Sequence, residues 1–149
     1  MTTLERTTSE HPDFIQLVAQ LDKELGERDG AEHSFYNQFN SISGLRHTVV
    51  AFMNKRPVAC GAIKEFDSYA MEVKRMFVVF DMRGKGIATL VLNELEKWAR
   101  EMNYESCVLE TGKRQPEAIA LYTKNGYKTI SNYGQYKGVE NSVCFSKTL

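Results

Sequence analysis

A strand that leads directly into a glycine-containing turn and a helix occupies the middle of the sequence. Residues 76–80 form an unbroken apolar run, Gly84 and Gly86 lie in the turn, and an amphipathic helix follows. In such an arrangement backbone N–H groups and the positive end of a helix dipole converge on one point, which favours a phosphate. The glycines let the backbone approach a ligand closely, and Arg83 and Lys85 add positive charge. The stretch therefore predicts a phosphate-binding turn between a strand and a helix.

Two well-known phosphate motifs do not describe this turn. A Walker P-loop needs Gly-Lys-Ser/Thr after a four-residue spacer, and a Rossmann fingerprint needs the full G-x-G-x-x-G spacing; the sequence has neither. The antiparallel strands expected before the turn also argue against a doubly wound fold. A different fold is therefore expected around this site.

Hydrophobic patterns elsewhere predict alternating strands and helices. Apolar residues recurring every three to four positions predict helices over residues 12–26, 87–102 and 116–124. Strands are expected at residues 3–7, 47–53, 58–66, 69–80, 106–110, 127–130 and 142–147. Residues 54–57 are expected to form a hairpin turn, and residues 27–46 a short helix or a mobile segment. This order predicts one α/β (α+β) domain, residues 1–149, with a mixed, mostly antiparallel sheet and helices on both faces.

Charge and apolar content exclude several classes of protein. Lys plus Arg and Asp plus Glu both number 19, so net charge favours neither nucleic acid nor an anionic membrane as a partner. The apolar runs are far shorter than the roughly 20 residues of a membrane helix, and the N-terminus lacks a signal-peptide core. Cys60, Cys107 and Cys144 form no C-x-x-C pair, and the histidines are scattered. We expect a cytoplasmic protein with neither a disulfide framework nor a metal site.

Two separated motifs resemble the signatures of the GNAT acetyltransferase superfamily. Arg83-x-x-Gly86-x-Ala88 matches the Q/R-x-x-G-x-G/A motif directly after an apolar strand. Residues 121–127 are similar to the second signature, Leu-Tyr-x-x-x-Gly followed by an aromatic residue. The resemblance covers roughly residues 48–130, and the tail is similar to that of small bacterial acetyltransferases.

The resemblance implies that the chain uses acetyl-CoA as a cosubstrate. The turn would hold the pyrophosphate through its N–H groups, and the preceding strand would hydrogen-bond the pantetheine arm beside a gap where the sheet splays. The cofactor-binding residues implied are Met76, Phe77, Val78, Arg83, Gly84, Lys85, Gly86, Ile87, Ala88 and Gln115. Gln115 departs from the family pattern, in which many members carry Asn.

The resemblance also points to catalytic groups. An alkylammonium, with a pKa near 10.4, has no lone pair, so attack on a thioester needs a base, and the departing thiolate needs an acid. Tyr122, in the second signature, is the candidate acid; the alternative is a half-buried helix tyrosine. Glu72, on the strand that enters the turn, is the candidate base; the alternative is an ion pair with Lys74. Glu110, on the facing strand, and an ordered chain of water are further candidates.

The substrate that accepts the acetyl group can be predicted only as a chemical class, an amine. No histidine stands beside a cysteine in the sequence, so we expect direct acetyl transfer, with the backbone N–H near Val78 polarising the thioester. Residues 27–46 and 131–141 are expected to select an amine of a small molecule or peptide. Protein acetylation, or CoA binding without catalysis, are the alternatives. Pairing of the final strand as an edge offers a route to a homodimer.

Overall fold

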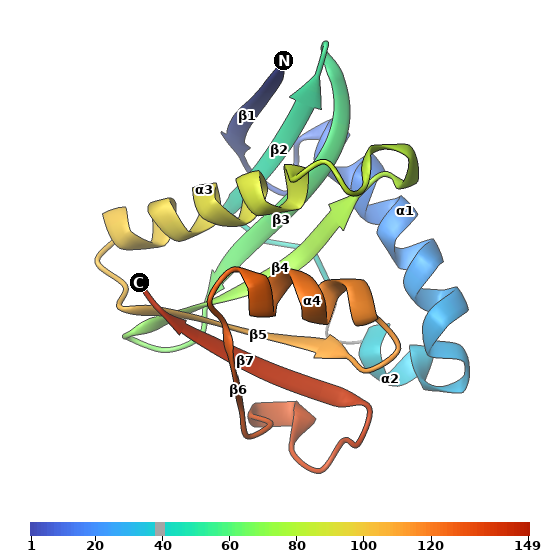
Figure 1. The fold of residues 1–149 in the computed structure, drawn as a ribbon, viewed down its shortest axis with the longest axis vertical. Coiled ribbons are helices and arrows are strands. Elements are labelled where there is room, and N and C mark those ends of the chain that lie inside the picture. Colours follow the sequence, from blue (N-terminus) through green and yellow to red (C-terminus); the bar gives the residue numbers. More distant parts are fainter. Residues whose placement is uncertain (38–40) are drawn as a thin grey trace.

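A seven-stranded sheet runs through the computed structural model, which describes residues 1–37 and 41–149 (Figure 1). The strands are β1 Thr2–Thr7, β2 His47–Met53, β3 Arg56–Glu65, β4 Ala70–Val78, β5 Ser106–Gly112, β6 Lys128–Ile130 and β7 Ser142–Thr148. Their order in the sheet is β1-β2-β3-β4-β5-β7-β6, and only the β4–β5 pair is parallel in the described part of the chain. The predicted mixed, mostly antiparallel sheet is confirmed.

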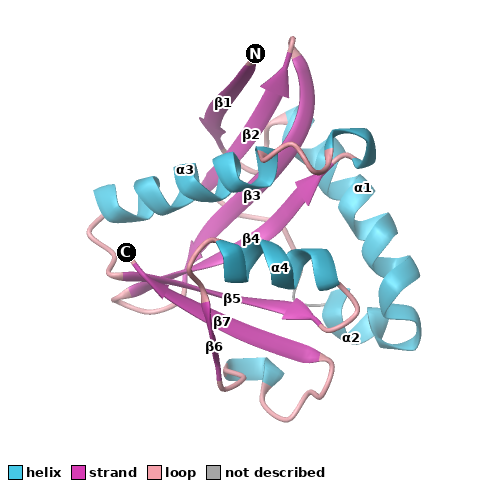
Figure 2. Ribbon diagram, in the orientation of Figure 1, coloured by secondary structure: helices cyan, strands magenta, loops and turns pink. Residues whose placement is uncertain are grey.

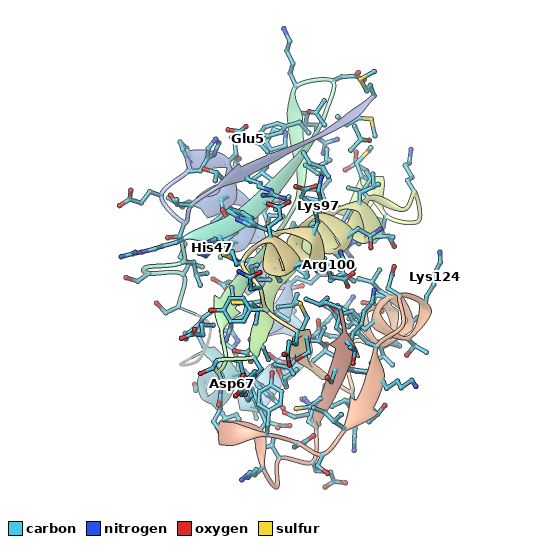
Figure 3. All side chains as sticks on the ribbon, turned by 90° about the vertical axis from the view of Figure 1, so that its left-hand side faces the viewer. Glu5, His47, Asp67, Lys97, Arg100 and Lys124 are labelled. Carbon is cyan, nitrogen blue, oxygen red and sulfur yellow. The ribbon has the colours of Figure 1, made fainter. Side chains whose placement is uncertain are left out.

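Helices cover both faces of this sheet. They are α1 Pro12–Asp29, α2 His33–Asn37, α3 Ile87–Glu101 and α4 Pro116–Lys124, with short 3-10 turns at η1 Gly30–Glu32, η2 Phe80–Met82 and η3 Gly134–Tyr136. Both α1 and α3 contact β2, β3 and β4, and Figure 1 shows α3 in front of these strands and the start of α1 behind them. One apolar stripe of α3 is buried, whereas Lys97 and Arg100 are exposed on its outer side (Figure 3).

The strands β4 and β5 separate soon after they meet. Their parallel pairing is limited to three residue pairs, from Ala70 with Ser106 to Glu72 with Val108. Figure 2 shows the two strands diverging beyond this point, with α1 and α4 beside the opening. The sheet therefore has the splay that the family resemblance implies.

A β-bulge interrupts β4 in the part that diverges from β5. The register of β3 against β4 shifts opposite Gly61, and Arg75 has a φ of 59° there. The Arg75 guanidinium pairs with Asp22 of α1, whereas Met76 lies on the α3 side against Gly61. A Cβ at position 61 would overlap the Met76 sulfur and approach Leu95 Cδ1 to 2.9 Å, so a larger residue there requires these side chains to move.

The first helix extends beyond its predicted end. The sequence predicted a stop at Gly26, but this glycine has no positive φ, and α1 continues to Asp29. Gly30, with a φ of 56°, ends the helix instead. The segment 27–46 therefore begins as helix and continues through η1 and α2; residues 38–40, which include Phe39, lie outside the described residues.

The hairpin turn is shorter than predicted. Asn54 and Lys55 alone connect β2 to β3, with φ values of 51° and 69°. A two-residue turn with positive φ at both positions matches the right-handed twist of paired strands. Pro57, predicted to belong to the turn, therefore lies within β3.

The final strand is not an edge of the sheet. It lies between β5 and β6, so β1 and β6 are the two edges. The final strand is therefore not the free edge that the predicted route to a homodimer requires, because residues 128–130 pair with its residues 144–146. The homodimer itself stays a prediction. No helix in the described ranges has the length and apolar character needed to cross a membrane.

Candidate active site

A groove of about 390 Å³ lies beside the diverging end of β4. Its walls are β4, the turn before α3, one side of α4 and the C-terminal half of α1. The predicted site residues in its lining are Met76, Phe77, Val78, Arg83, Gly84, Gly86, Ile87, Ala88, Gln115 and Tyr122. Lys85 is not part of the lining. The two sequence motifs thus meet at one groove.

The turn before α3 presents backbone donors to this groove. Gly86 is the N-cap residue, and no side chain in the described part of the chain caps the helix. The N–H groups of Ile87, Ala88 and Thr89 precede the first helical hydrogen bond, which Leu90 donates to Gly86. These donors and the helix dipole make this end of α3 favourable for an anion.

The Arg83 side chain ties the turn to β4 and α1. Its Nε donates to the Val78 carbonyl at 2.9 Å, and its terminal nitrogens contact the two carboxylate oxygens of Glu24 at 2.9 and 2.8 Å. The guanidinium also lies 5.6 Å from the ring centre of Phe77. Arg83 therefore lines the groove with its charge already paired to α1.

A series of alternating charges connects three walls of the groove. Glu24 lies 3.3 Å from Arg28, one helical turn further along α1, and Arg28 pairs with Glu117 of α4. Arg83, Glu24, Arg28 and Glu117 form what we term the groove ion-pair chain. Its formal charges cancel, so the preference for an anion comes from the backbone N–H groups of the turn and from Lys124, which also lines the groove.

The open side of β4 offers further backbone groups. Val79 donates its N–H to Val58 of β3 at 2.9 Å. Successive residues of a strand direct their N–H groups to opposite sides. The N–H of Val78 therefore faces away from β3, on the side where Arg83 contacts the Val78 carbonyl.

An inner cavity of about 110 Å³ adjoins the groove between β4 and β5. Met76, Gln115 and Tyr122 line both spaces. Glu72 and Glu110 line the inner cavity only. The structure therefore brings the two predicted catalytic residues, Tyr122 and Glu72, to the same cavity from α4 and β4.

Tyr122 is more buried than the sequence suggests. Its side chain is 6% exposed and packs against the rings of Tyr127 and Phe145, with centroid distances of 5.7 and 6.1 Å. Burial, and secondarily the charge of Glu110, raise the pKa of the Tyr122 hydroxyl well above its ordinary value. The phenol is therefore protonated at neutral pH and able to donate.

Two carboxylates of the inner cavity have different surroundings. Glu72 Oε2 accepts a hydrogen bond from the Tyr133 hydroxyl at 2.6 Å, and its Oε1 lies 3.8 Å from Lys74 Nζ. Glu110 Oε2 is buried without a hydrogen-bond partner among the described residues. Burial raises the pKa of Glu110 to about 7. Glu110 can thus change protonation state near neutral pH.

A polar cluster borders the inner cavity at Tyr36, and no pattern in the sequence indicated it. The Tyr36 hydroxyl lies 3.1 Å from Ser142 Oγ and accepts a hydrogen bond from Asn141 Nδ2 at 3.1 Å. Asp29 adds a buried carboxylate at the end of α1. Tyr36 and Ser142 are separated by 106 residues, and local periodicity carries no signal of such a contact.

Comparison with known proteins gives a consistent result. The sequence profile of the Acetyltransferase (GNAT) family matches residues 13–127. An IAA acetyltransferase from Azospirillum brasilense is 33% identical over 99% of this chain and 97% of its own length. A Klebsiella pneumoniae structure assigned as an acyl-CoA N-acyltransferase has a TM-score of 0.84 at 29% identity, covering 100% of this chain and 98% of its own. A GNAT acetyltransferase from Elizabethkingia anophelis with acetyl-CoA bound has a TM-score of 0.72 at 18% identity, covering 99% and 98% of the two chains.

Proposed function

Because the chain belongs to the GNAT acetyltransferase family, we propose that it transfers the acetyl group of acetyl-CoA directly to an amine of a small molecule or peptide. One observation carries the proposal: the groove at the uncapped start of α3 adjoins the inner cavity, and Tyr122 lines both. Residues 1–149 would act as a single domain. The cytoplasmic location and bacterial origin remain predictions.

The groove suits acetyl-CoA in its charge and its backbone groups. The N–H groups from Arg83 to Ala88 would hold the pyrophosphate, and the open side of β4, from Met76 to Val78, would hydrogen-bond the amides of the pantetheine arm. Gln115 lines both spaces and would lie near the thioester end. The structurally similar GNAT acetyltransferase from Elizabethkingia anophelis has acetyl-CoA bound, which supports this assignment.

Proton transfer would use groups of the inner cavity. Bound acetyl-CoA supplies a thioester carbonyl and a sulfur leaving group. The Val78 N–H would polarise the carbonyl, and Tyr122 would protonate the sulfur. Glu72, the base predicted from sequence, and Glu110 are the two candidates to receive the proton that the amine loses.

Burial of the cysteines supports direct transfer. Burial raises the pKa of the Cys60 and Cys107 thiols to about 12, and it also raises the pKa of Cys144. A thiol must ionise to act as a nucleophile, so none of the three is suited to carry an acyl group. We propose that acetyl-CoA and the amine are bound together.

The test combines binding and turnover. Acetyl-CoA and CoA should each raise the melting temperature, and a panel of ethylamine, putrescine, glycine and a lysine-containing tetrapeptide should include an amine that releases free thiol. Tyr122→Phe should lower the rate of thiol release by about 100-fold or more and leave CoA binding intact. Tyr127→Phe is the matched control, because that ring packs on Tyr122 while its hydroxyl bonds Glu96.

Each negative result points to a different conclusion. If neither CoA species stabilises the protein, the proposed cofactor is wrong. Stabilisation without release on the whole panel would favour the CoA-binding module. Release with the tetrapeptide but with none of the small amines would favour protein acetylation.

A further inference from the structure

The inner cavity contains a buried carboxylate oxygen that no group in the described chain satisfies. Glu110 projects from β5 on the far side of the opening from β4, and its Oε2 has no hydrogen-bond partner there. An unsatisfied buried acceptor is costly and uncommon in folded proteins. This oxygen lies beside Tyr122 in a cavity that adjoins the cofactor groove. An N–H group of the amine substrate would be expected to bind there.

Every element around the cavity contributes a polar or charged group near Glu110. Glu72 and Lys74 come from β4, and Asp29 from α1. The hydroxyl groups are those of Tyr36 on α2, Tyr122 on α4, Tyr136 on η3 and Ser142 on β7. Burial chiefly raises the pKa of Glu110, and Glu72 and Asp29 raise it further, while Ser142 and Lys74 oppose this shift. The charged residues of the lining are the carboxylates Asp29, Glu72 and Glu110 and the cations Lys74 and Arg75. Arg75 is paired with Asp22 of α1, so the remaining charges favour a cationic acceptor.

Glu72 lacks the free oxygen that Glu110 has. The Tyr133 hydroxyl donates to Oε2 at 2.6 Å, and Lys74 lies near Oε1. Tyr133 in turn packs its ring on Phe66, with a centroid distance of 4.8 Å, and on Tyr136 at 5.9 Å. Glu72 therefore anchors the loop 131–141 to β4.

We propose that Glu110 is the catalytic base, and that Glu72 is a positioning residue that holds Tyr133 and the loop 131–141 against the cavity. This inference rests on the proposed acetyltransferase function. An N–H bond of the bound ammonium breaks, the proton forms an O–H bond on Glu110 Oε2, and the electron pair stays on nitrogen for attack on the acyl carbon. An N–C bond forms and the C–S bond breaks, with its electron pair leaving on sulfur. Tyr122 gives its proton to that sulfur and regains one from the nitrogen. Glu110 then releases its proton to solvent, so that one proton leaves per acetyl group transferred.

The test measures kcat/KM against pH, with the fastest amine of the panel, for Glu110→Gln and Glu72→Gln. In the wild type kcat/KM should rise with pH through a step near 7, where Glu110 loses its proton. Glu110→Gln should remove this step and lower kcat by about 100-fold or more. Glu72→Gln and Tyr133→Phe should keep the step and raise KM for the amine by a similar factor, because both break the same contact.

Stabilisation by CoA should be unchanged in all three variants, which shows that they fold. The inference is overturned if Glu110→Gln keeps both the step and most of the activity, or if Glu72→Gln removes the step. In either case a loss of activity in Tyr122→Phe would still support the acetyltransferase. A panel without any thiol release would overturn the proposed function and this inference together.

Discussion

Glu24 of α1 holds the guanidinium of Arg83 through two contacts, at 2.9 and 2.8 Å, at the point where the turn meets β4. This pair places a negative charge beside the proposed pyrophosphate site and occupies the arginine of the first sequence motif. Both side chains are partly exposed, 27% for Glu24 and 30% for Arg83, so water screens the pair.

Glu24→Gln should therefore tighten acetyl-CoA binding. The change removes a like charge from the groove and releases Arg83 toward the phosphates, which should lower Kd about fivefold, equivalent to about 1 kcal/mol. Isothermal titration at two salt concentrations measures this effect, which should shrink as salt rises. Weaker binding would instead mean that Glu24 orders Arg83 for the cofactor.

Gly86→Ala should destabilise the protein and weaken cofactor binding. Gly86 has a φ of 79°, and a Cβ there would meet no heavy atom within 4 Å, so the cost arises from backbone conformation and not from crowding. That cost is about 1–2 kcal/mol, measurable by urea unfolding, and the stabilisation by CoA should shrink. Gly26→Ala is the control, because Gly26 lies inside α1 in ordinary contact distance of His33 and should gain up to about 1 kcal/mol. Equal stability of the two variants would contradict the argument.

Glu110→Gln should make the protein more stable at pH 8 than the wild type. Folding raises the pKa of this carboxyl from 4.5 to about 7, so the folded state binds the proton more tightly and stability falls as pH rises between these values. Above pH 7 the charged carboxylate costs about 3 kcal/mol that the neutral amide avoids. Urea unfolding at pH 4.5 and pH 8 should show a gain that is small at the lower pH and full at the higher one. A gain independent of pH would show that burial of charge is not its cause.

Lys147→Met should destabilise the fold without changing cofactor binding. The Lys147 ammonium contacts Glu96, a buried residue of α3, at 2.8 Å. Tyr127 donates a hydrogen bond to the same carboxylate at 2.9 Å. Removing the lysine leaves a charge on a side chain that is only 2% exposed, at a cost of about 3 kcal/mol. Adding Glu96→Gln should recover most of that loss in urea unfolding. If Lys147→Met alone is as stable as the wild type, the buried charge of Glu96 does not need Lys147 to stabilise it.

The fold was largely predictable because its signals are local. Apolar periodicity located the helices that cover the sheet, and the two motifs, from Arg83 and from Leu121, identified the residues that the structure brings to one groove. Errors arose where a local signal reports neither the backbone conformation nor the neighbouring strand. Gly26 ends no helix because its backbone is helical, and the final strand is covered because a three-residue strand folds beside it.

The details of the site depend on distant pairs that sequence patterns do not reveal. Arg83 and Glu24 are 59 residues apart, and Glu72 and Tyr133 are 61 apart. Each contact changes the role expected of a residue in a motif. A side chain that already binds another residue of the protein is less available to bind the cofactor or to accept a proton. Hydrogen bonding also separates the two glutamates on neighbouring strands, because Tyr133 donates to Glu72 whereas Glu110 Oε2 has no partner among the described residues.

The short parallel pairing of β4 with β5 divides the sheet into two hydrogen-bonded blocks, β1 to β4 and β5 to β6, joined along a seam of three residue pairs. Helix α3 packs on strands of both blocks, and one hydrophobic core includes side chains of both. The two blocks are nevertheless free to exchange their amide hydrogens with solvent at different rates. A ligand in the groove would contact β4 and α4 together, so a bound ligand should slow amide exchange on both sides of the seam.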